Sequence, residues 1–314
     1  MKIMEARNRS LNDWFARIRT RQVVLPRFQR FEAWTHRMVA GLLDTVLREL
    51  PAGALLVLEV GDEEPFVSRV MVGAPENGDK IVEHLLDGQQ RLTALWRSLT
   101  DNYPDRTYFV EMNSDEQEDE SSGPLRTMSQ GRWRKNGRLY PLWADDPVSV
   151  WDRQLIPARL LRPDHEAEKE FKEWAKSAAQ DDTDELIRLI SLGADLPARF
   201  AGFNLPFLSL SLPPTTPRET ALDVFVKMNT SVQPLSTYDI VVAQVEAATG
   251  FSLHELVSEL RKEAPTLEIF AEPAQVILNA GALLQDREPS KSVMLSNDFA
   301  EGLIDNWAKL VSGA

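Results

Sequence analysis

The sequence predicts an α+β fold, in which a mixed α/β half is followed by a mainly helical half. Short apolar runs bounded by turn residues, such as ALLVLEV at 54–60, are typical of buried strands. Past Pro163 the apolar residues instead recur at helical spacing, as in HEAEKEFKEWAKSAA. We therefore expect an α/β core at 1–112, an irregular connection at 113–162 and a mainly helical region at 163–314.

The elements of the first half follow from their apolar patterns. A short helix pattern opens the chain (Leu11, Trp14, Phe15, Ile18), and Pro26 makes QVVLP a strand that runs into a turn. Apolar residues at helical spacing predict a helix from 38 to 50, ended by Pro51 and Gly53. Strands are predicted at 54–60 and in FVSRVMVG and KIVEHLLD, which the turn APENGD separates.

The rest of the chain is read in the same way. After DGQQR come a helix, LTALWRSL, and a strand, TYFVEM, followed by an acidic loop at 113–124. We expect 125–165 to be irregular. Helices are predicted in HEAEKEFKEWAKSAA, TDELIRLISLGA and TALDVFVKMN, and a strand in FNLPFLSLSLPP. Most of the remainder is expected to be helical, including FAEGLIDNWAKLVSG. The sequence leaves open whether the chain is complete or the front part of a longer one.

Composition narrows the class of protein. The net charge of −13 argues against a protein that coats nucleic acid uniformly. With no cysteines, there is neither a disulfide framework nor a cysteine-ligated metal site. No apolar run approaches the roughly 18 residues that span a bilayer, so we expect a cytoplasmic protein with no membrane partner.

The charge is distributed unevenly along the chain. Basic residues dominate the segment from Lys2 to Arg37, and a second basic cluster, GRWRKNGR at 131–138, interleaves them with Trp133. Arg132, Arg134 and Lys135 in this cluster are candidate DNA contacts, because local basic faces can meet phosphates even in an acidic protein. The alternative is ordinary solvated surface charge.

The stretch HLLDGQQRLTALWRSL at 84–99 carries the main chemical candidate. An apolar strand ends in Asp87-Gly88, and an amphipathic helix starts at once. The first backbone N–H groups of such a helix, together with its dipole, favour a phosphate. Gly88 permits close approach, and Arg91 offers a planar fork to phosphate oxygens. We expect the Arg91 side chain to reach solvent and to face the phosphate. Gln89 and Gln90 can orient a water or read a base edge, and Asp87 could hold Mg²⁺ or a sugar hydroxyl. The alternative is a helix start with a surface arginine.

Two further stretches combine polar and aromatic residues. LPRFQRFEAW at 25–34 sets Gln29 and Arg30 among aromatic side chains; these two residues belong to a site only if they face DGQQR. In FVKMNTSVQPLSTYDIV at 225–241, Asn229 closes a helix, and Ser236 with Asp239 predicts the start of the next one. Asn229 is either a ligand contact or a loop residue.

Other catalytic motifs are missing. GAPENGDK at 73–80 imitates a phosphate-binding P-loop, but Asp79 stands where its lysine should be. The four histidines have no zinc-ligand spacing, and His84, near the end of an apolar strand, is expected to be a packed core residue.

Taken together and in this order, LPRFQRFEAW, PAGALLVLEV, LLDGQQRLTAL and FVKMNTSVQPLSTYDIV resemble the N-terminal domain of GmrSD-type modification-dependent restriction enzymes. The resemblance covers roughly residues 5–245 and extends to the N-terminal domain of the phosphorothioate-sensing protein SspE. It implies a ParB/sulfiredoxin-like fold, and NTP hydrolysis coupled to the recognition of modified DNA in anti-phage defence.

Carried over by position, the resemblance implies a nucleotide site formed by Asp87, Gly88, Gln89, Gln90 and Arg91. Gln29 and Arg30 would lie across from it, and Asn229 would contribute from the third stretch. The implied cofactors are an NTP (GTP, ATP or CTP) and Mg²⁺, with Asp87 as metal ligand. The implied partner is modified DNA, and a homo-oligomer is compatible with it.

The sequence departs from the full-length pattern of this family in one respect. Longer members resemble two-part enzymes with a histidine-rich HNH nuclease domain, which these residues do not contain. We therefore expect a nuclease domain or partner protein elsewhere, or a sensor-only module. Three alternatives stay open: a non-catalytic DNA-binding or regulatory module, a DGQQR-dependent DNA nickase, and a purely structural scaffold.

Overall fold

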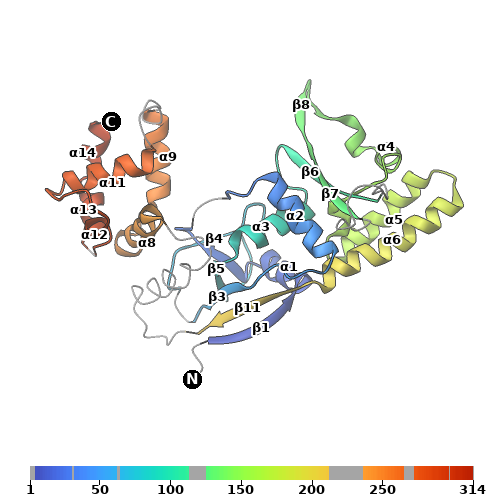
Figure 1. Cartoon of the computed structure of the whole chain (residues 1–314), viewed down its shortest axis with the longest axis horizontal. Coiled ribbons are helices and arrows are strands. Elements are labelled where there is room, and N and C mark those ends of the chain that lie inside the picture. Colours follow the sequence, from blue (N-terminus) through green and yellow to red (C-terminus); the bar gives the residue numbers. More distant parts are fainter. Residues whose placement is uncertain are drawn as a thin grey trace. The chain divides into compact units, whose positions relative to one another are not determined.

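The computed structural model describes residues 4–29, 32–61, 64–112, 125–211, 236–264, 272–296 and 298–313. It confirms the predicted α+β class, because both helices and sheets are extensive (Figure 1). The chain divides into two units. The first comprises Met1–Val24, Glu32–Val57 and Val70–Leu210, and the second comprises Leu25–Phe31, Leu58–Arg69 and Ser211–Ala314. The expected boundaries near 112 and 162 stay a prediction.

A mixed sheet lies at the centre of the first unit. Its strands follow the order β1-β11-β3-β5-β2, and they are β1 (Met4–Ser10), β11 (Asn204–Leu210), β3 (Leu55–Glu59), β5 (Glu83–Asp87) and β2 (Val23–Pro26). Strands β1 and β11 pair antiparallel over their whole length, whereas β2 and β5 run parallel, with Val23 beside Glu83. The ends of β2 and β3 continue into the second unit. The predicted strands at 54–60 and before DGQQR are thereby confirmed.

The first unit also contains three amphipathic helices: α1 (Leu11–Arg19), α2 (His36–Leu47) and α3 (Gln89–Leu99). Ser10 caps α1 by accepting a hydrogen bond from the backbone N–H of Asp13. The buried face of α1 joins two elements, because Trp14 meets Phe207 of β11 edge-on and Phe15 meets Trp96 of α3 in the same way. His84 of β5 is fully buried, as predicted.

A second layer of the first unit is a three-stranded sheet of order β10-β6-β7. Its strands and the short elements beside them are β6 (Arg106–Glu111), β7 (Arg126–Gly131), β8 (Trp133–Lys135), β9 (Arg138–Tyr140), η1 (Leu142–Asp145), α4 (Pro147–Trp151), β10 (Leu155–Pro157) and η2 (Ala158–Leu161). The expectation of an irregular 125–165 was therefore wrong. These strands are short and several are half-exposed, so they lack the apolar runs that reveal buried strands.

Two long helices, α5 (His165–Ala179) and α6 (Thr183–Gly202), complete the first unit and confirm the predicted helices there. They pack closely where Gly193 meets Phe171: a Cβ at Gly193 would lie 2.5 Å from the phenyl ring.

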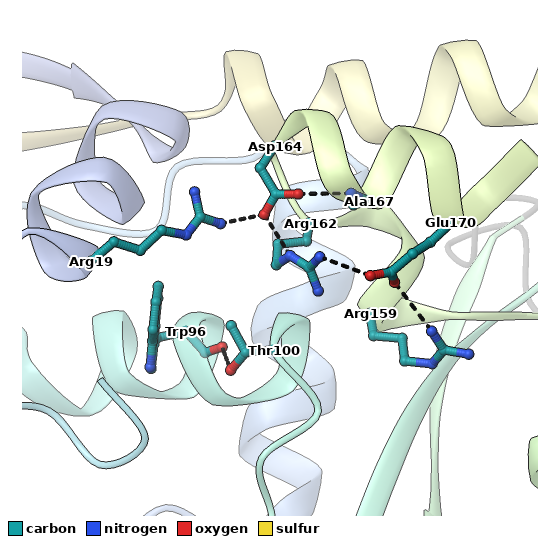
Figure 2. A network of polar contacts seen from close by, with 8 residues as sticks. All are labelled: Arg19, Trp96, Thr100, Arg159, Arg162, Asp164, Ala167 and Glu170. Atoms are coloured by element: carbon teal, nitrogen blue, oxygen red, sulfur yellow. Dashed lines mark hydrogen bonds and ion pairs between the residues drawn. The ribbon is translucent and has the colours of Figure 1, made fainter. Parts of the chain in front are cut away.

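A polar network fixes the start of α5 (Figure 2). Asp164 accepts a 2.7 Å hydrogen bond from the backbone N–H of Ala167, and it also accepts hydrogen bonds from Arg162 and Arg19. Burial raises the pKa of Asp164, but these hydrogen bonds and charges outweigh it and hold the pKa below its usual value. The network therefore stabilises the ionised carboxylate and ties α5 to α1 and η2.

The second unit is mainly helical. Its described elements are strand β4 (Ser68–Arg69) and helices α8 (Thr237–Thr249), α9 (Leu253–Glu263), α11 (Pro273–Leu283), α12 (Lys291–Met294), α13 (Phe299–Asp305) and α14 (Trp307–Ser312). Of the predicted strand FVSRVMVG only β4 forms, paired with Leu25 and Pro26. The predicted helix TALDVFVKMN lies outside the described residues. None of the helices in the described parts of the chain has the length and apolarity needed to cross a membrane.

Candidate functional site

The strand-to-helix junction predicted at DGQQR is present in the first unit. Strand β5 ends at Asp87, and Gly88 is the N-cap of α3 with φ 88° and ψ 11°, a left-handed conformation that favours glycine. Its cap makes no side-chain hydrogen bond, unlike Ser10 before α1. A Cβ at Gly88 would lie 2.1 Å from Cδ2 of Leu55, at the start of β3. Any other residue at this turn would have to displace the side chain of Leu55.

Arg91 lies in the first turn of α3 and holds the loop between α2 and β3. Its Nη1 donates to the carbonyl of Ala52 at 2.7 Å, and its Nη2 donates to that of Ala54 at 2.8 Å. Nη2 also lies 3.7 Å from the carboxylate of Asp87. Burial lowers the pKa of Arg91, and the charge of Asp87 opposes that shift. The guanidinium thus carries a partly buried positive charge beside the start of the helix.

Two glycines make room for this guanidinium. A Cβ at Gly53, which also has a positive φ, would lie 2.5 Å from Nη1 of Arg91, and one at Gly88 would lie 3.2 Å from Nη2. The side chain of Arg91 is only 20% exposed. We expected this side chain to reach into solvent, and that expectation was wrong, because the backbone carbonyls of the loop hold it back. Its predicted contact with phosphate stays a prediction.

The two glutamines differ in their surroundings. Oε1 of Gln90 accepts a 2.9 Å hydrogen bond from the backbone N–H of Ala33, in the segment that leads into α2. Gln89 is buried, at 8% exposure. A second contact to the segment before α2 comes from the C-terminal half of α3, where Arg97 donates a 2.7 Å hydrogen bond to the carboxylate of Glu32. Helix α3 therefore bonds to the segments on both sides of α2. No sequence pattern indicates these contacts, since backbone groups of alanines carry no side-chain signal.

Asp87 is the exposed acid of the junction, with 47% of its side chain accessible. The described residues contain no group of three or more acids and histidines that could form a protein-only metal site. Mg²⁺ is commonly held by one or two carboxylates together with substrate phosphates. A half-exposed aspartate next to a helix start without a side-chain cap fits that donor set.

The remaining predicted site residues are not all described. Arg30 and Asn229 lie outside the described residues. Gln29 is buried in the second unit, where its carbonyl accepts a 3.2 Å hydrogen bond from Arg69. Asp239 forms a reciprocal capping box with Ser236 at the start of α8, which confirms the predicted helix start and gives Asp239 a structural role.

The candidate DNA contacts at 132–135 separate into two groups. Arg132 is buried, its guanidinium pairs with Asp145, and its backbone N–H donates to the carbonyl of Asp105 at 2.6 Å. Arg134 and Lys135 are exposed on β8. The structure therefore presents two of these three predicted residues to solvent.

Comparison with known proteins supports the family assignment. A family described as the GmrSD restriction endonuclease, N-terminal domain, matches residues 11–246. An uncharacterized protein of Methanocaldococcus jannaschii is 24% identical over 236 residues, which cover 71% of this chain and 39% of the relative. The aligned region thus spans well under half the length of that relative. Because the family match extends over most of the sequence and includes the DGQQR junction, the chain belongs to the GmrSD restriction endonuclease N-terminal domain family.

Proposed function

We propose that this chain is the NTP-binding and NTP-hydrolysing sensor domain of an anti-phage restriction system that recognises modified DNA. The observation that carries the proposal is the Asp87-Gly88 junction. There a buried strand hands over to a helix whose N-cap makes no side-chain hydrogen bond and has no Cβ. Backbone N–H groups and the helix dipole both favour anions at such a point.

Each residue of the junction has a different role in this proposal. The first turn of α3 and the charge of Arg91 bind the phosphates of GTP, ATP or CTP. Asp87 is the residue that would hold Mg²⁺, which neutralises phosphate charge when bound. One glutamine, Gln89 or Gln90, orients the attacking water. Catalysis then rests on positioning and electrostatics, as in other phosphoryl transfers.

The rest of the restriction system supplies cleavage. We propose that DNA is the partner, that a nuclease domain or partner protein cuts it, and that the nucleotide state of this domain controls the cut. The family match shows that the chain belongs to a restriction-system family. Oligomerisation of the chain is compatible with the proposal but does not enter it.

The experiment is phosphate release from each of the four NTPs with Mg²⁺, in the presence of unmodified or modified DNA. Asp87→Asn removes one exposed charge at the junction. Asp105→Asn is the matched control, because it removes one exposed negative charge from the segment that follows the C-terminal end of α3. We expect the wild type and Asp105→Asn to release phosphate at similar rates. Asp87→Asn should lower that rate at least about tenfold without changing the melting temperature.

Two other outcomes would replace the proposal. Salt-dependent DNA binding without any turnover would make the chain a regulatory module whose junction holds a DNA phosphate. Mg²⁺-dependent nicking of DNA that disappears in Asp87→Asn would make the junction a nuclease site.

A further inference from the structure

Strands β8 and β9 form an exposed hairpin with an aromatic and basic surface. In Figure 1 its tip projects beyond the three-stranded sheet of its own unit. The turn is Asn136-Gly137, with both residues at positive φ (52° and 77°), as a tight two-residue hairpin turn requires. Trp133 pairs with Tyr140, Arg134 with Leu139, and Lys135 with Arg138.

The register sorts these side chains onto two faces. Alternate residues of a strand point to opposite faces, and directly paired residues share a face. Trp133, Tyr140, Lys135 and Arg138 therefore lie on one face, which we name the aromatic–basic face. Arg134 and Leu139 lie on the other.

The aromatic–basic face has properties that a structural role does not require. The rings of Trp133 and Tyr140 stack nearly parallel, at 16° and 6.2 Å between centroids. Trp133 is nonetheless 53% exposed, so much of its surface stays in water. Lys135 and Arg138 beside it are exposed too, and the hairpin contains no acid although the whole chain carries a net charge of −13.

Two anchors hold the base of the hairpin. Arg132, just before β8, pairs with Asp145 and donates its backbone N–H to the carbonyl of Asp105. Strand β7 leads directly into this residue. Arg132 is thus a positioning residue for the hairpin rather than a phosphate contact.

We propose that the aromatic–basic face binds a single-stranded or locally unpaired segment of DNA, stacking a base on Trp133 and pairing phosphates with Lys135 and Arg138. An exposed indole offers a flat surface that any unstacked base can cover, and neighbouring cations follow the backbone. An acidic peptide would also be attracted by the positive charge. Its carboxylates would contact only the basic side chains, however, whereas a DNA base would also cover the exposed aromatic rings. The inference takes from the proposed function only that the partner is DNA.

The test is fluorescence anisotropy of a fluorescein-labelled single strand of about 20 nucleotides, longer than one binding site, titrated with the full chain without nucleotide. Because stacking on an aromatic side chain is lost, Trp133→Ala should weaken binding roughly 5- to 150-fold. Trp133→Phe should keep most of the affinity, because it retains an aromatic ring. Lys135→Ala should reduce the dependence on salt by about 0.7 in the logarithmic slope.

The opposite face provides the matched control. Arg134→Ala removes the same charge as Arg138→Ala from the other side of the hairpin, and it should weaken binding less. A blunt duplex of the same sequence should bind more weakly than the single strand. Melting temperatures of all variants must equal that of the wild type.

Three results would overturn the inference. Trp133→Ala could bind as the wild type does, or Arg134→Ala and Arg138→Ala could weaken binding equally, or polyglutamate could displace the strand as well as unlabelled DNA does. The last result would identify an acidic protein as the partner. Since no nucleotide is present, failure of NTP turnover at the junction would leave this titration unaffected.

Discussion

At the scale of single residues, Gly88 is required for two reasons: its left-handed backbone conformation and its close packing against Leu55. Alanine in the left-handed region costs about 1–2 kcal/mol, and its Cβ would also have to displace Leu55. We expect Gly88→Ala to lower the free energy of unfolding by about 3 kcal/mol in urea titration.

A double-mutant cycle separates the two terms of that loss. In a Leu55→Ala background the methyl group added by Gly88→Ala no longer meets the leucine side chain, so the cost should fall to the conformational part of about 1–2 kcal/mol. An unchanged cost in that background would show that Leu55 plays no part.

Arg91 carries the second residue-scale prediction. Arg91→Ala removes two hydrogen bonds from a charged donor to the loop before β3, so it should lower the free energy of unfolding by about 1.5–3 kcal/mol. Arg91→Lys keeps the charge but loses the planar fork that reaches both carbonyls, and it should fall in between. Urea midpoints measure both. If Arg91→Ala unfolds at the wild-type midpoint, the two bonds contribute nothing to stability.

The residues that the sequence could predict are those with a side-chain signature. Gly88 and His84 were recognised from the glycine turn and the apolar strand around them, and both lie as expected. The loop-holding contacts of Arg91 and Gln90 were not, because their acceptor and donor atoms belong to the backbone of alanines. An alanine in the sequence does not indicate which side chain bonds to its peptide group.

At the scale of elements, helix α9 makes the second unit sensitive to pH. Burial lowers the pKa of His254, whose Nε2 lies 3.1 Å from the carbonyl of Phe28. The unfolded chain therefore binds the proton more tightly than the folded one. Stability should decrease as the pH falls below the ordinary value of 6.5, until it passes the lowered pKa.

The pH prediction is tested by urea unfolding between about pH 7.5 and 5.0, a window that brackets the ordinary histidine pKa. His254→Gln should remove this loss, whereas His36→Gln, at the exposed start of α2, should leave it in place. Burial raises the pKa of Glu246, which works in the opposite direction, so the difference between variant and wild type is the quantity to compare. Equal slopes for wild type and His254→Gln would contradict the prediction.

Elements were predictable where apolar residues kept a clear period. Helices α5 and α6 and strands β3, β5 and β6 follow from such periods. Strand β1 was missed because its residues are mostly exposed and polar, and only pairing with β11 fixes its conformation. The same reason explains the missed strands β7 to β9. Edge strands of this kind depend on partners far away in the sequence, which a local pattern cannot reveal.

At the scale of the whole molecule, nucleotide binding should raise the stability of the folded chain. A ligand that binds only the folded chain stabilises it by about 2.7 kcal/mol at roughly a hundred times its dissociation constant. We expect Mg²⁺ with the preferred NTP to raise the melting temperature of the full chain, and Asp87→Asn to lose most of that shift. Differential scanning fluorimetry with each NTP measures it, and equal shifts in wild type and variant would place the nucleotide elsewhere.

The fixing of α2 restricts how the first unit can move. Its leading segment is bonded to Gln90 and its trailing loop to Arg91, while Asp44 within it accepts a 2.6 Å hydrogen bond from the backbone N–H of Thr127 on β7. Any translation of α2, along its axis or sideways, would therefore break these bonds or move their partners with it. Through Asp44 such a translation would carry β7 with it, and the next strand along the chain is the first strand of the exposed hairpin.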